Sequence, residues 1–580
     1  MKTKNGYKIK SDKELTLPEE IPPAYEKHGS LKAISRETGT PWRRMHKLYS
    51  LAVDQNLMTP IRVGNKGRED FKDSTRYTVR KEGKVRAIKP TELSVEPDEK
   101  GIKRYFFTCA QNNTALFDPL WNNMNVLAEY YNARIVISRF TYVKNAIGSQ
   151  GDKNKIGPSK YNSIDRNDIT WDSRIVPYIV DERTEVAPGL IWCGEMNILP
   201  TAVRPLSGLE TYTRRESGIF PHAKIALESI PSNKAEPTKF NYTTGAVTQR
   251  NYIHKKAGLK GEFHHTYGFL LVEVDKEGNW FARQVVADDK GQIYDLDVKV
   301  SAGKITTSNR VEAIYWGDGH FIEADSVAVD IAFGKNGIKD QLRPKSDYIG
   351  DTISFRSRSH HEIKDPHIMY QHHVNGIEPI ENEIALTINV LKNKLYRQWC
   401  KTNLVYGNHE RHLGRWLKEQ SGLKDPVNAL FWVNAQKKGY DFIKKYGYEP
   451  NWLKVAIEIM EPGVVSLFNF LLEDQSSIVC HNRSGGVECG MHGDRGPKGA
   501  KGTASNLSRM GRKVCIGDKH SAEIKDGVFV AGTFSSLTDC GWAKGPSNWS
   551  HSHTVIYPNG KRAILTCWKG YFAAGRTNDE

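Results

Sequence analysis

The 580-residue chain lacks the features that would place it in a membrane or in an oxidising compartment. Its eight cysteines are scattered and no two form a CxxC pair, which argues against a disulfide framework. The longest apolar run, GVVSLFNFLL at 463–472, is about half of what a membrane-spanning helix needs. The N-terminal MKTKNGYKIKSDKEL is basic but has no apolar stretch of the kind found in secretory signals. We therefore expect a cytoplasmic protein with reduced thiols and no membrane partner.

Positive charge, in contrast, is abundant and unevenly placed. The formal net charge is +16, and residues 1–104 hold 24 Lys and Arg against 15 Asp and Glu. A basic excess confined to one end favours a polyanionic partner there, although a lysine-rich terminus can simply aid solubility. Hydrophobic residues make up 38% of the chain and aromatic residues 10%, which is enough for globular cores. At this length we expect two large domains and a small one.

Residues 1–53 resemble the small helix-turn-helix modules of phage and bacterial regulators. Pro22 and Pro23 open a short helix that stops at Gly29, and LKAISRET at 31–38 predicts a second helix. A third, basic helix begins at Thr40 and Pro41. In this motif such a helix enters the major groove, so we expect DNA contacts from Trp42, Arg43, Arg44 and Lys47. The alternative is a helical hairpin that docks another domain.

Residues 54–103 are polar and charged and are interpreted as a linker. From residue 104 the sequence becomes more apolar, and RYFFTCA and ARIVISRFTY predict buried strands on either side of a helix. Further strands are expected at 174–180, 190–199, 224–230 and 268–274. We therefore predict that residues 104–309 form an α/β domain, to which the sequence assigns no role.

From residue 311 onward, five apolar strands each run into a glycine and then into residues that can bind metal. In chain order these residues are Asp318, His320, Asp351, Asn408, His409, His492, Asp518 and His520. Strand ends followed by glycine-containing loops are where open α/β sheets place their ligands. Carboxylate and amide oxygens mixed with imidazoles suit manganese, iron or zinc. Two ions about 3.5–4 Å apart can both generate a hydroxide and clamp the oxygens of a phosphate displacement. Any one of these pieces alone would be an ordinary capped turn.

The motifs GDGH, GDTIS, GNHE, MHGD and GDKH over residues 317–520 resemble those of the calcineurin-like metallophosphoesterase superfamily. The resemblance implies a β-sandwich flanked by helices over residues 310–580 and two divalent ions, most readily Mn²⁺, with Mg²⁺, Fe²⁺ or Zn²⁺ as alternatives. It implies that the first ion is held by Asp318, His320, Asp351 and His520. Asp351 would bridge to a second ion held by Asn408, His492 and Asp518, and His409 would be the general acid. The chain departs from the family pattern at Ser354, where an acid is common, and at Asp518, where a histidine is common.

Two other patterns compete for parts of this set. His551 and His553 have the HxH spacing of the last family motif, but they precede a strand, whereas the other ligand loops follow one. Cys480, His481, Cys489 and His492 could be interpreted as a zinc knuckle, although their spacing is irregular. His360, His361 and Arg495 lie near the predicted centre in the sequence and either contact substrate or support the ligands.

The chain also resembles a group of T-five-like tailed-phage proteins that destroy host DNA early in infection. The resemblance rests on RYFFTCAQNNT, NARIVISRFTY and VIYPNGKRAIL and extends over residues 104–570. It implies a metal-dependent DNase of the infected bacterial cytoplasm. It also implies that the protein acts as a homo-oligomer and with other phage or host proteins. Two alternatives remain open, a phosphatase or phosphodiesterase for proteins or small nucleotides, and a non-catalytic DNA-binding regulator.

Overall fold

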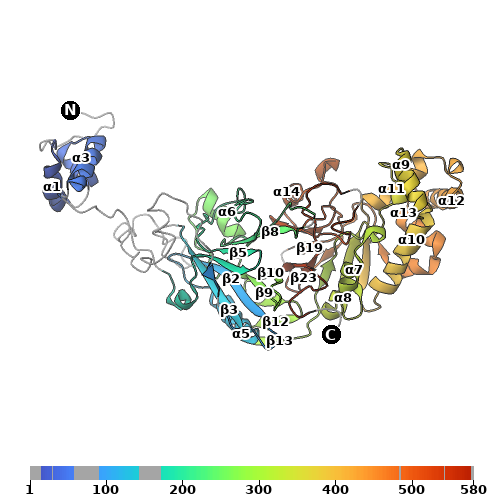
Figure 1. Ribbon diagram of the computed structural model, residues 1–580, viewed down its shortest axis with the longest axis horizontal. Helices are drawn as coiled ribbons and strands as arrows, with labels where there is room; N and C mark the ends of the chain where they lie inside the picture. Colours follow the sequence, from blue (N-terminus) through green and yellow to red (C-terminus); the bar gives the residue numbers. More distant parts are fainter. Residues whose placement is uncertain are drawn as a thin grey trace. The chain divides into compact units, whose positions relative to one another are not determined.

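The computed structural model describes residues 15–28, 31–55, 57, 91–93, 95–142, 171–234, 236–481, 485–540 and 543–576. The described residues belong to two compact units, 15–57 and 91–576 (Figure 1). Most of the predicted linker, residues 58–90, lies outside the described part of the chain. Within that part, no helix combines the length and the apolar character needed to cross a membrane.

The first unit is a bundle of three short helices. These are α1 (Ile21–His28), α2 (Leu31–Thr38) and α3 (Trp42–Asp54), preceded by the 3-10 helix η1 (Pro18–Glu20). Their apolar faces enclose a small core formed by Ile21, Leu31, Ile34, Met45, Leu48 and Ala52. The helices therefore occur where the sequence predicts them, and their use in DNA recognition is taken up below.

The second unit is mixed α/β, with four sheets among its described residues. The largest has the order β1-β4-β5-β6-β8-β7-β21-β22-β20-β19-β18. Its strands are β1 (Thr91–Glu92), β4 (Arg183–Ala187), β5 (Leu190–Cys193), β6 (Ser217–Phe220), β7 (Leu227–Ile230), β8 (Lys239–Thr243), β18 (Ile478–Val479), β19 (Val487–Glu488), β20 (Lys513–Ile516), β21 (Glu523–Lys525) and β22 (Val528–Val530).

Two further sheets form a second layer beneath this one. A four-stranded sheet has the order β10-β9-β2-β3, with β2 (Lys103–Gln111), β3 (Ala133–Phe140), β9 (Gly268–Val274) and β10 (Trp280–Val286). A six-stranded sheet has the order β17-β16-β15-β14-β23-β24, with β14 (Ala313–Tyr315), β15 (Ser346–Gly350), β16 (Lys401–Val405), β17 (Asn469–Phe470), β23 (Ser552–Ile556) and β24 (Arg562–Thr566). Edge strands β10 and β24 of the two sheets lie beside each other. One continuous apolar core then joins this layer to the 11-stranded sheet, through Tyr105, Leu270, Tyr315 and Ile556 on one side and Trp192, Tyr242, Cys515 and Phe529 on the other.

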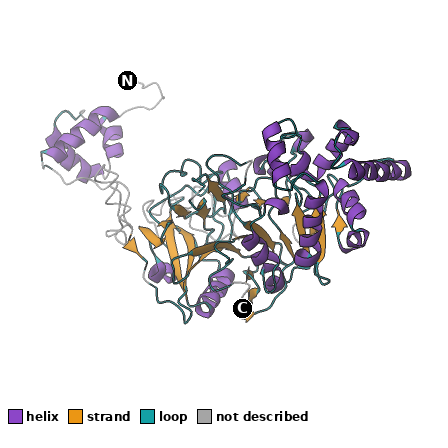
Figure 2. Cartoon of the chain, turned by 45° about the vertical axis from the view of Figure 1, so that its right-hand side comes forward, coloured by secondary structure: helices purple, strands orange, loops and turns teal. Residues whose placement is uncertain are grey.

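Helices cover the outer faces of the second layer (Figure 2). Against the six-stranded sheet pack α7 (Ser326–Phe333), α8 (Ile338–Leu342), α10 (Ile380–Asn389), α11 (Asn408–Glu419) and α13 (Trp452–Met460). Helix α12 (Ala429–Tyr446) packs on α11 and α13. The outer face of the four-stranded sheet is covered by α5 (Asp118–Tyr130), whose Leu120, Met124 and Leu127 meet Phe106 and Leu271. The remaining elements are α6 (Lys256–His264), α9 (Pro366–Val374), α14 (Ala504–Leu507) and a three-stranded sheet of β11 (Ile293–Asp295), β12 (Val298–Ser301) and β13 (Lys304–Thr306).

The predicted boundary between residues 309 and 310 is not a structural boundary. Strand β7 pairs antiparallel with β21, almost three hundred residues further along the chain. Lys224 and Asp526 form an ion pair beside this junction. Because the 11-stranded sheet takes strands from both sides of residue 310, residues 91–576 share one core and form one unit. Both sheet layers therefore contain strands from residues 104–309 as well as strands from residues 310–580.

The predicted strand at 174–180 is also wrong. Residues Ser173–Tyr178 form a 3-10 helix, η3. The Asp172 side chain caps its first turn by accepting a hydrogen bond from the Arg174 backbone N–H at 3.1 Å. Pro177 lacks the backbone N–H that a strand would donate to a neighbour. An apolar, β-branched run therefore forms a helical turn here.

Candidate metal centre

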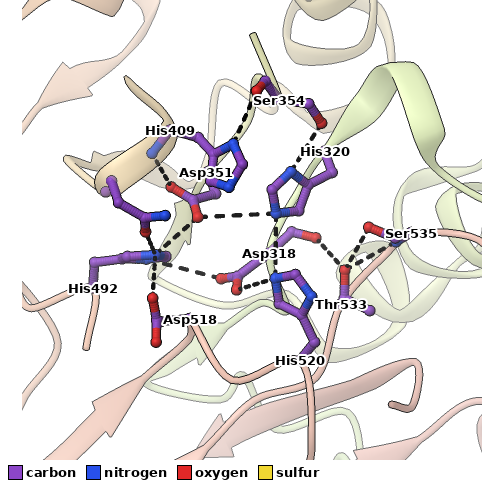
Figure 3. A network of polar contacts seen from close by, with 12 residues as sticks. Asp318, His320, Asp351, Ser354, His409, His492, Asp518, His520, Thr533 and Ser535 are labelled. Carbon is purple, nitrogen blue, oxygen red and sulfur yellow. Dashed lines mark hydrogen bonds and ion pairs between the residues drawn. The ribbon is translucent and has the colours of Figure 1, made fainter. Parts of the chain in front are cut away.

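The five predicted loops meet at one place, between the two large sheets. Strands β14, β15 and β16 are parallel neighbours, so the loops that follow them leave the same edge of the six-stranded sheet. Asp318 and His320 follow β14, Asp351 follows β15, and Asn408 and His409 follow β16. The parallel strands β19 and β20 of the other sheet supply His492, Asp518 and His520. Figure 3 shows the side chains of the aspartates and histidines in this set turned toward one another.

The backbone of the loops is bent into an unusual conformation at four of the predicted ligands. His320, Asp351, Asp518 and His520 have φ values of 38°, 46°, 64° and 58°. Such left-handed conformations are uncommon for residues other than glycine, and clusters of them occur at functional sites. The loops are therefore shaped to present these side chains inward.

Two glycines are required because ligand side chains pass directly against the backbone. A Cβ atom on Gly407 would lie 2.1 Å from Oδ1 of Asp351. A Cβ atom on Gly517 would lie 2.0 Å from Oδ1 of Asp318. The glycines that precede the polar residues in the sequence thus make room for carboxylates from neighbouring loops.

The first group of ligand atoms comes from Asp318, His320 and His520. Nε2 of His520 lies 3.1 Å from Oδ2 of Asp318 and 3.2 Å from Nε2 of His320. All three residues are buried, and one donor atom from each lies within 4.8 Å of the others. This is the spacing of ligands around a single ion.

The second group surrounds Asp351 and His492. Nε2 of His492 lies 3.0 Å from Oδ2 of Asp351 and 3.1 Å from Oδ1 of Asn408. Oδ2 of Asp351 also lies 3.9 Å from Nε2 of His320, which belongs to the first group. Asp351 thus stands between the two groups, where a bridging carboxylate would stand.

Two residues lie differently from the rest of the predicted set. Oδ1 of Asp518 is 4.0 Å from Nε2 of His492, and its other oxygen pairs with Lys519, so Asp518 lies at the rim of the second group. His409 could itself be a ligand, because it forms a third group of possible donors with His320 and Asp351.

The charges in the centre are incompletely balanced by the protein. Burial raises the pKa of the Asp318 carboxyl above its ordinary value despite the neighbouring His492 and His520. Burial alone would also raise the pKa of Asp351, but His492, His409 and His320 hold it well below the ordinary value. For His492 burial is outweighed by Asp351 and Asp318, which raise its pKa well above the usual range. Positive charge is therefore strongly favoured beside these carboxylates, and a divalent ion supplies it better than a proton.

The donor set fits divalent metal ions. Both carboxylate oxygens of Asp318 are buried, and within the described part of the chain neither accepts a hydrogen bond of good geometry. A buried carboxylate without hydrogen bonds is costly unless a cation is coordinated to it. The mixture of carboxylate, amide oxygen and imidazole donors suits manganese, iron or zinc.

Ser354 orients two of the imidazoles, a role that the sequence did not reveal. Its hydroxyl donates to Oε2 of Glu323 at 2.8 Å and therefore accepts from Nδ1 of His320 at 2.9 Å. This arrangement places the proton of His320 on Nδ1 and directs Nε2 to the centre. The Ser354 carbonyl oxygen accepts from Nδ1 of His409 at 2.9 Å. Position 354 thus carries a serine where the family commonly has an acid, and the carboxylate of Glu323 lies on the far side of the Ser354 hydroxyl from His320.

A second residue missed by the sequence analysis is Glu410. Its buried carboxylate accepts from the backbone N–H of Thr352 at 2.7 Å and from that of Gly407 at 3.0 Å. It therefore ties the loop after β15 to the loop after β16. The signal was present in the GNHE motif, where Glu410 is the last residue.

The competing histidine pair lies behind the centre. Nδ1 of His553 accepts from the backbone N–H of Gly317 at 3.1 Å, and the ring packs on Trp316 and Phe534. Nε2 of His551 lies 3.0 Å from the Ser535 carbonyl oxygen. Neither histidine belongs to a group of possible metal ligands among the described residues, and Cys480, His481 and Cys489 do not either.

The residues that were predicted near the substrate lie on a large cavity beside the centre. The cavity has a volume of about 950 Å³ and is lined by Asn408, His360, His361, His412 and Arg495, among others. Arg495 pairs with Glu473 on its wall. On α3, the predicted DNA contacts Arg44 and Lys47 are exposed, whereas the side chains of Trp42 and Arg43 lie outside the described residues.

The similarity of this chain to a known protein identifies it as a bacteriophage protein. The chain is similar to Protein A1 of Escherichia phage T5, with 32% identity over 483 residues that cover 81% of this chain and 83% of the phage protein. The chain therefore belongs to the family of this phage protein. No protein-family model and no solved structure matches the chain.

Proposed function

We propose that the chain is a metal-dependent nuclease that hydrolyses phosphodiester bonds of DNA in the cytoplasm of the infected bacterial cell. The observation that carries the proposal is the convergence of five strand-end loops on one buried set of carboxylates and imidazoles. The order and the sequence motifs of these loops resemble those of the calcineurin-like metallophosphoesterases, to which we assign residues 310–580. The family relationship to a phage protein supports the setting.

Two divalent ions would be held by the seven predicted ligands. Asp318, His320 and His520 would hold one ion, and Asn408, His492 and Asp518 the other, with Asp351 between them. Oxygen-rich donor sets of this kind favour Mn²⁺, with Mg²⁺, Fe²⁺ and Zn²⁺ as alternatives. When bound, such a pair activates water and neutralises the charge that develops on the phosphate.

His409 is suited to protonate the leaving oxygen. Its backbone N–H donates to Oδ1 of Asp351 at 3.1 Å, which fixes the residue against the bridging carboxylate. Its Nδ1 donates to the Ser354 carbonyl oxygen at 2.9 Å, so Nε2 is the nitrogen that exchanges a proton with substrate. Loss of this ring should abolish cleavage without emptying the seven-ligand centre.

Cations beside the centre offer a path for a phosphate backbone. Arg415, Lys418 and Arg495 line the cavity with side chains that are about half exposed, and each pairs with a glutamate. Exposed ion pairs contribute little stability, so these cations can exchange their partners for phosphates. Arg44 and Lys47 on the exposed face of α3 would add contacts to DNA from the first unit.

The test is cleavage of supercoiled, linear and single-stranded DNA by the purified full chain, with and without Mn²⁺. We expect metal-dependent cleavage that is lost in Asp351→Asn and in His409→Ala, while both variants still bind DNA. Asp441→Asn and His367→Ala, two changes at exposed positions outside the centre, serve as controls and should cleave normally.

Other outcomes would point to other functions. Metal-dependent hydrolysis of a small aryl phosphodiester without DNA cleavage would replace the nuclease by a phosphodiesterase for small substrates. Binding of DNA with no hydrolysis of either substrate would indicate a regulator whose metal centre is structural.

A further inference from the structure

A second cluster of histidines stands on the cavity wall, outside the seven-ligand centre. His360, His361 and His412 each place one ring nitrogen within 4.8 Å of the others. The ring centroid of His360 lies 3.8 Å from the ring centroid of His361 and 4.7 Å from that of His412. Three imidazoles at this spacing match the ligand set around one ion.

The fold holds the three residues in place. His412 lies on α11, three residues after His409, so both rings project from the same face of the helix and lie 4.7 Å apart. His360 and His361 follow the 3-10 helix η5 (Arg356–Arg358). Nη2 of Arg358 anchors that segment to Oδ1 of Asp425 at 2.7 Å, and the Arg358 side chain is only 5% exposed.

The cluster contains polar atoms for which the protein offers no partner. Nδ1 of His360 and Nδ1 of His412 are buried, and no described residue forms a hydrogen bond with either. A buried ring nitrogen without a partner costs free energy comparable to a lost hydrogen bond. Two such nitrogen atoms within one group of imidazoles indicate that a bound ion or small molecule is the missing partner of these rings.

We propose that His360, His361 and His412 bind a third metal ion, of the zinc class. Three neutral nitrogen donors without a carboxylate favour Zn²⁺, or another ion that prefers imidazole, over Mn²⁺ and Mg²⁺. The site therefore differs in metal preference from the oxygen-rich centre, from which it is separated by the ring of His409.

The position of the cluster defines what the ion would do. All three histidines line the cavity of about 950 Å³. An ion held by three protein ligands keeps a fourth position for another ligand, and at this site that ligand would come from the cavity. It would hold water or an anionic oxygen, such as a phosphate oxygen, beside Asn408 of the seven-ligand centre.

The test counts metal and does not depend on nuclease activity. Metal-free full chain is loaded with Zn²⁺, dialysed, and its zinc content is measured by mass spectrometry. Wild type should hold one equivalent of zinc more than His361→Ala, a change at an exposed position that should not disturb folding. His412→Ala should lose the same equivalent, and the control His367→Ala should lose none. Asp351→Asn, which disrupts the other centre, should retain it.

Equal zinc content in wild type, His361→Ala and His412→Ala would overturn the proposal. So would loss of all zinc in Asp351→Asn, because the cluster would then have no site of its own. Inorganic phosphate that binds to the metal-free chain and is lost in His361→Ala would mean that the histidines bind an anion directly. Each of these results leaves the test of DNA cleavage unaffected.

Discussion

Replacement of Ser354 by alanine tests whether the ligands are held as described. Its hydroxyl is the acceptor for Nδ1 of His320 and the donor to Glu323. His320 is fully buried, so water cannot replace the hydroxyl without entering the core. The substitution removes the contact that keeps the proton on Nδ1 and leaves Nε2 available to a metal.

The size of the effect follows from the burial of the pair. A buried polar group that loses its hydrogen bond is destabilised by about 1–3 kcal/mol. Since about 1.4 kcal/mol corresponds to a factor of ten, metal binding should weaken by about 5- to 150-fold. This agrees with the roughly 10- to 100-fold losses seen when residues that orient metal ligands are removed. Arg356 still pairs with Glu323 at 2.7 Å, so the fold should survive.

The assay is a titration of metal-free protein with Mn²⁺, in which free Mn²⁺ is followed by electron paramagnetic resonance. Ser357→Ala is the matched control, because that nearby serine is buried and its hydroxyl has no hydrogen-bond partner among the described residues. Ser354→Ala should require more Mn²⁺ for the same occupancy, whereas Ser357→Ala should bind like wild type. Unchanged affinity in Ser354→Ala would refute the assigned role of His320 and its orientation.

Three further predictions follow from the same geometry. Gly517→Ala should abolish tight Mn²⁺ binding, because its Cβ would lie 2.0 Å from Asp318 Oδ1. In the control Gly463→Ala the new Cβ meets no atom within 4 Å, so this variant should bind Mn²⁺ normally. Equal Mn²⁺ binding by the two variants would contradict this prediction. Burial lowers the pKa of His553 to about 3. Below pH 6.5 the unfolded chain therefore takes up a proton that the native chain does not. The free energy of unfolding then falls as the pH is lowered, by up to about 1.4 kcal/mol per pH unit. Urea unfolding of His553→Gln at pH 7 and pH 5 should therefore show a smaller pH dependence than wild type, and an equal dependence would argue against a buried, neutral imidazole. Asp518→Ala should lose Mn²⁺-dependent DNA cleavage while Asp518→His keeps it with an altered metal preference; full activity of the alanine variant would remove Asp518 from the ligand set.

The secondary structure was more predictable than the way the sheets assemble. Strand β9 begins and ends where GFLLVEV predicts, because a continuous apolar run with flanking polar residues is characteristic of a buried strand. The pairing of β7 with β21 could not be predicted, since hydrophobic pattern defines a strand and its faces but not a partner far along the chain. The expected boundary at residue 310 failed for this reason. At 174–180 the pattern misled, because Pro177 and the cap from Asp172 favour a helical turn.

The residues that meet at the candidate centre could be selected from the sequence because each follows a strand and a glycine, a local pattern that does not depend on how the sheets are arranged. The residues that support them were not, because their partners are distant in sequence. Ser354 meets Glu323 from another loop, and Glu410 meets Thr352 across 58 residues. His412 lies two residues after the GNHE motif, and its three-residue spacing from His409 on a helix was the available signal.

The most direct test of the account is an anomalous difference map from crystals of the full chain grown with Mn²⁺. We predict two peaks about 3.5–4 Å apart on either side of Asp351, one beside His320 and His520 and the other beside Asn408 and His492. A map without manganese at this position, or with manganese bound only by other residues, would contradict the central claim.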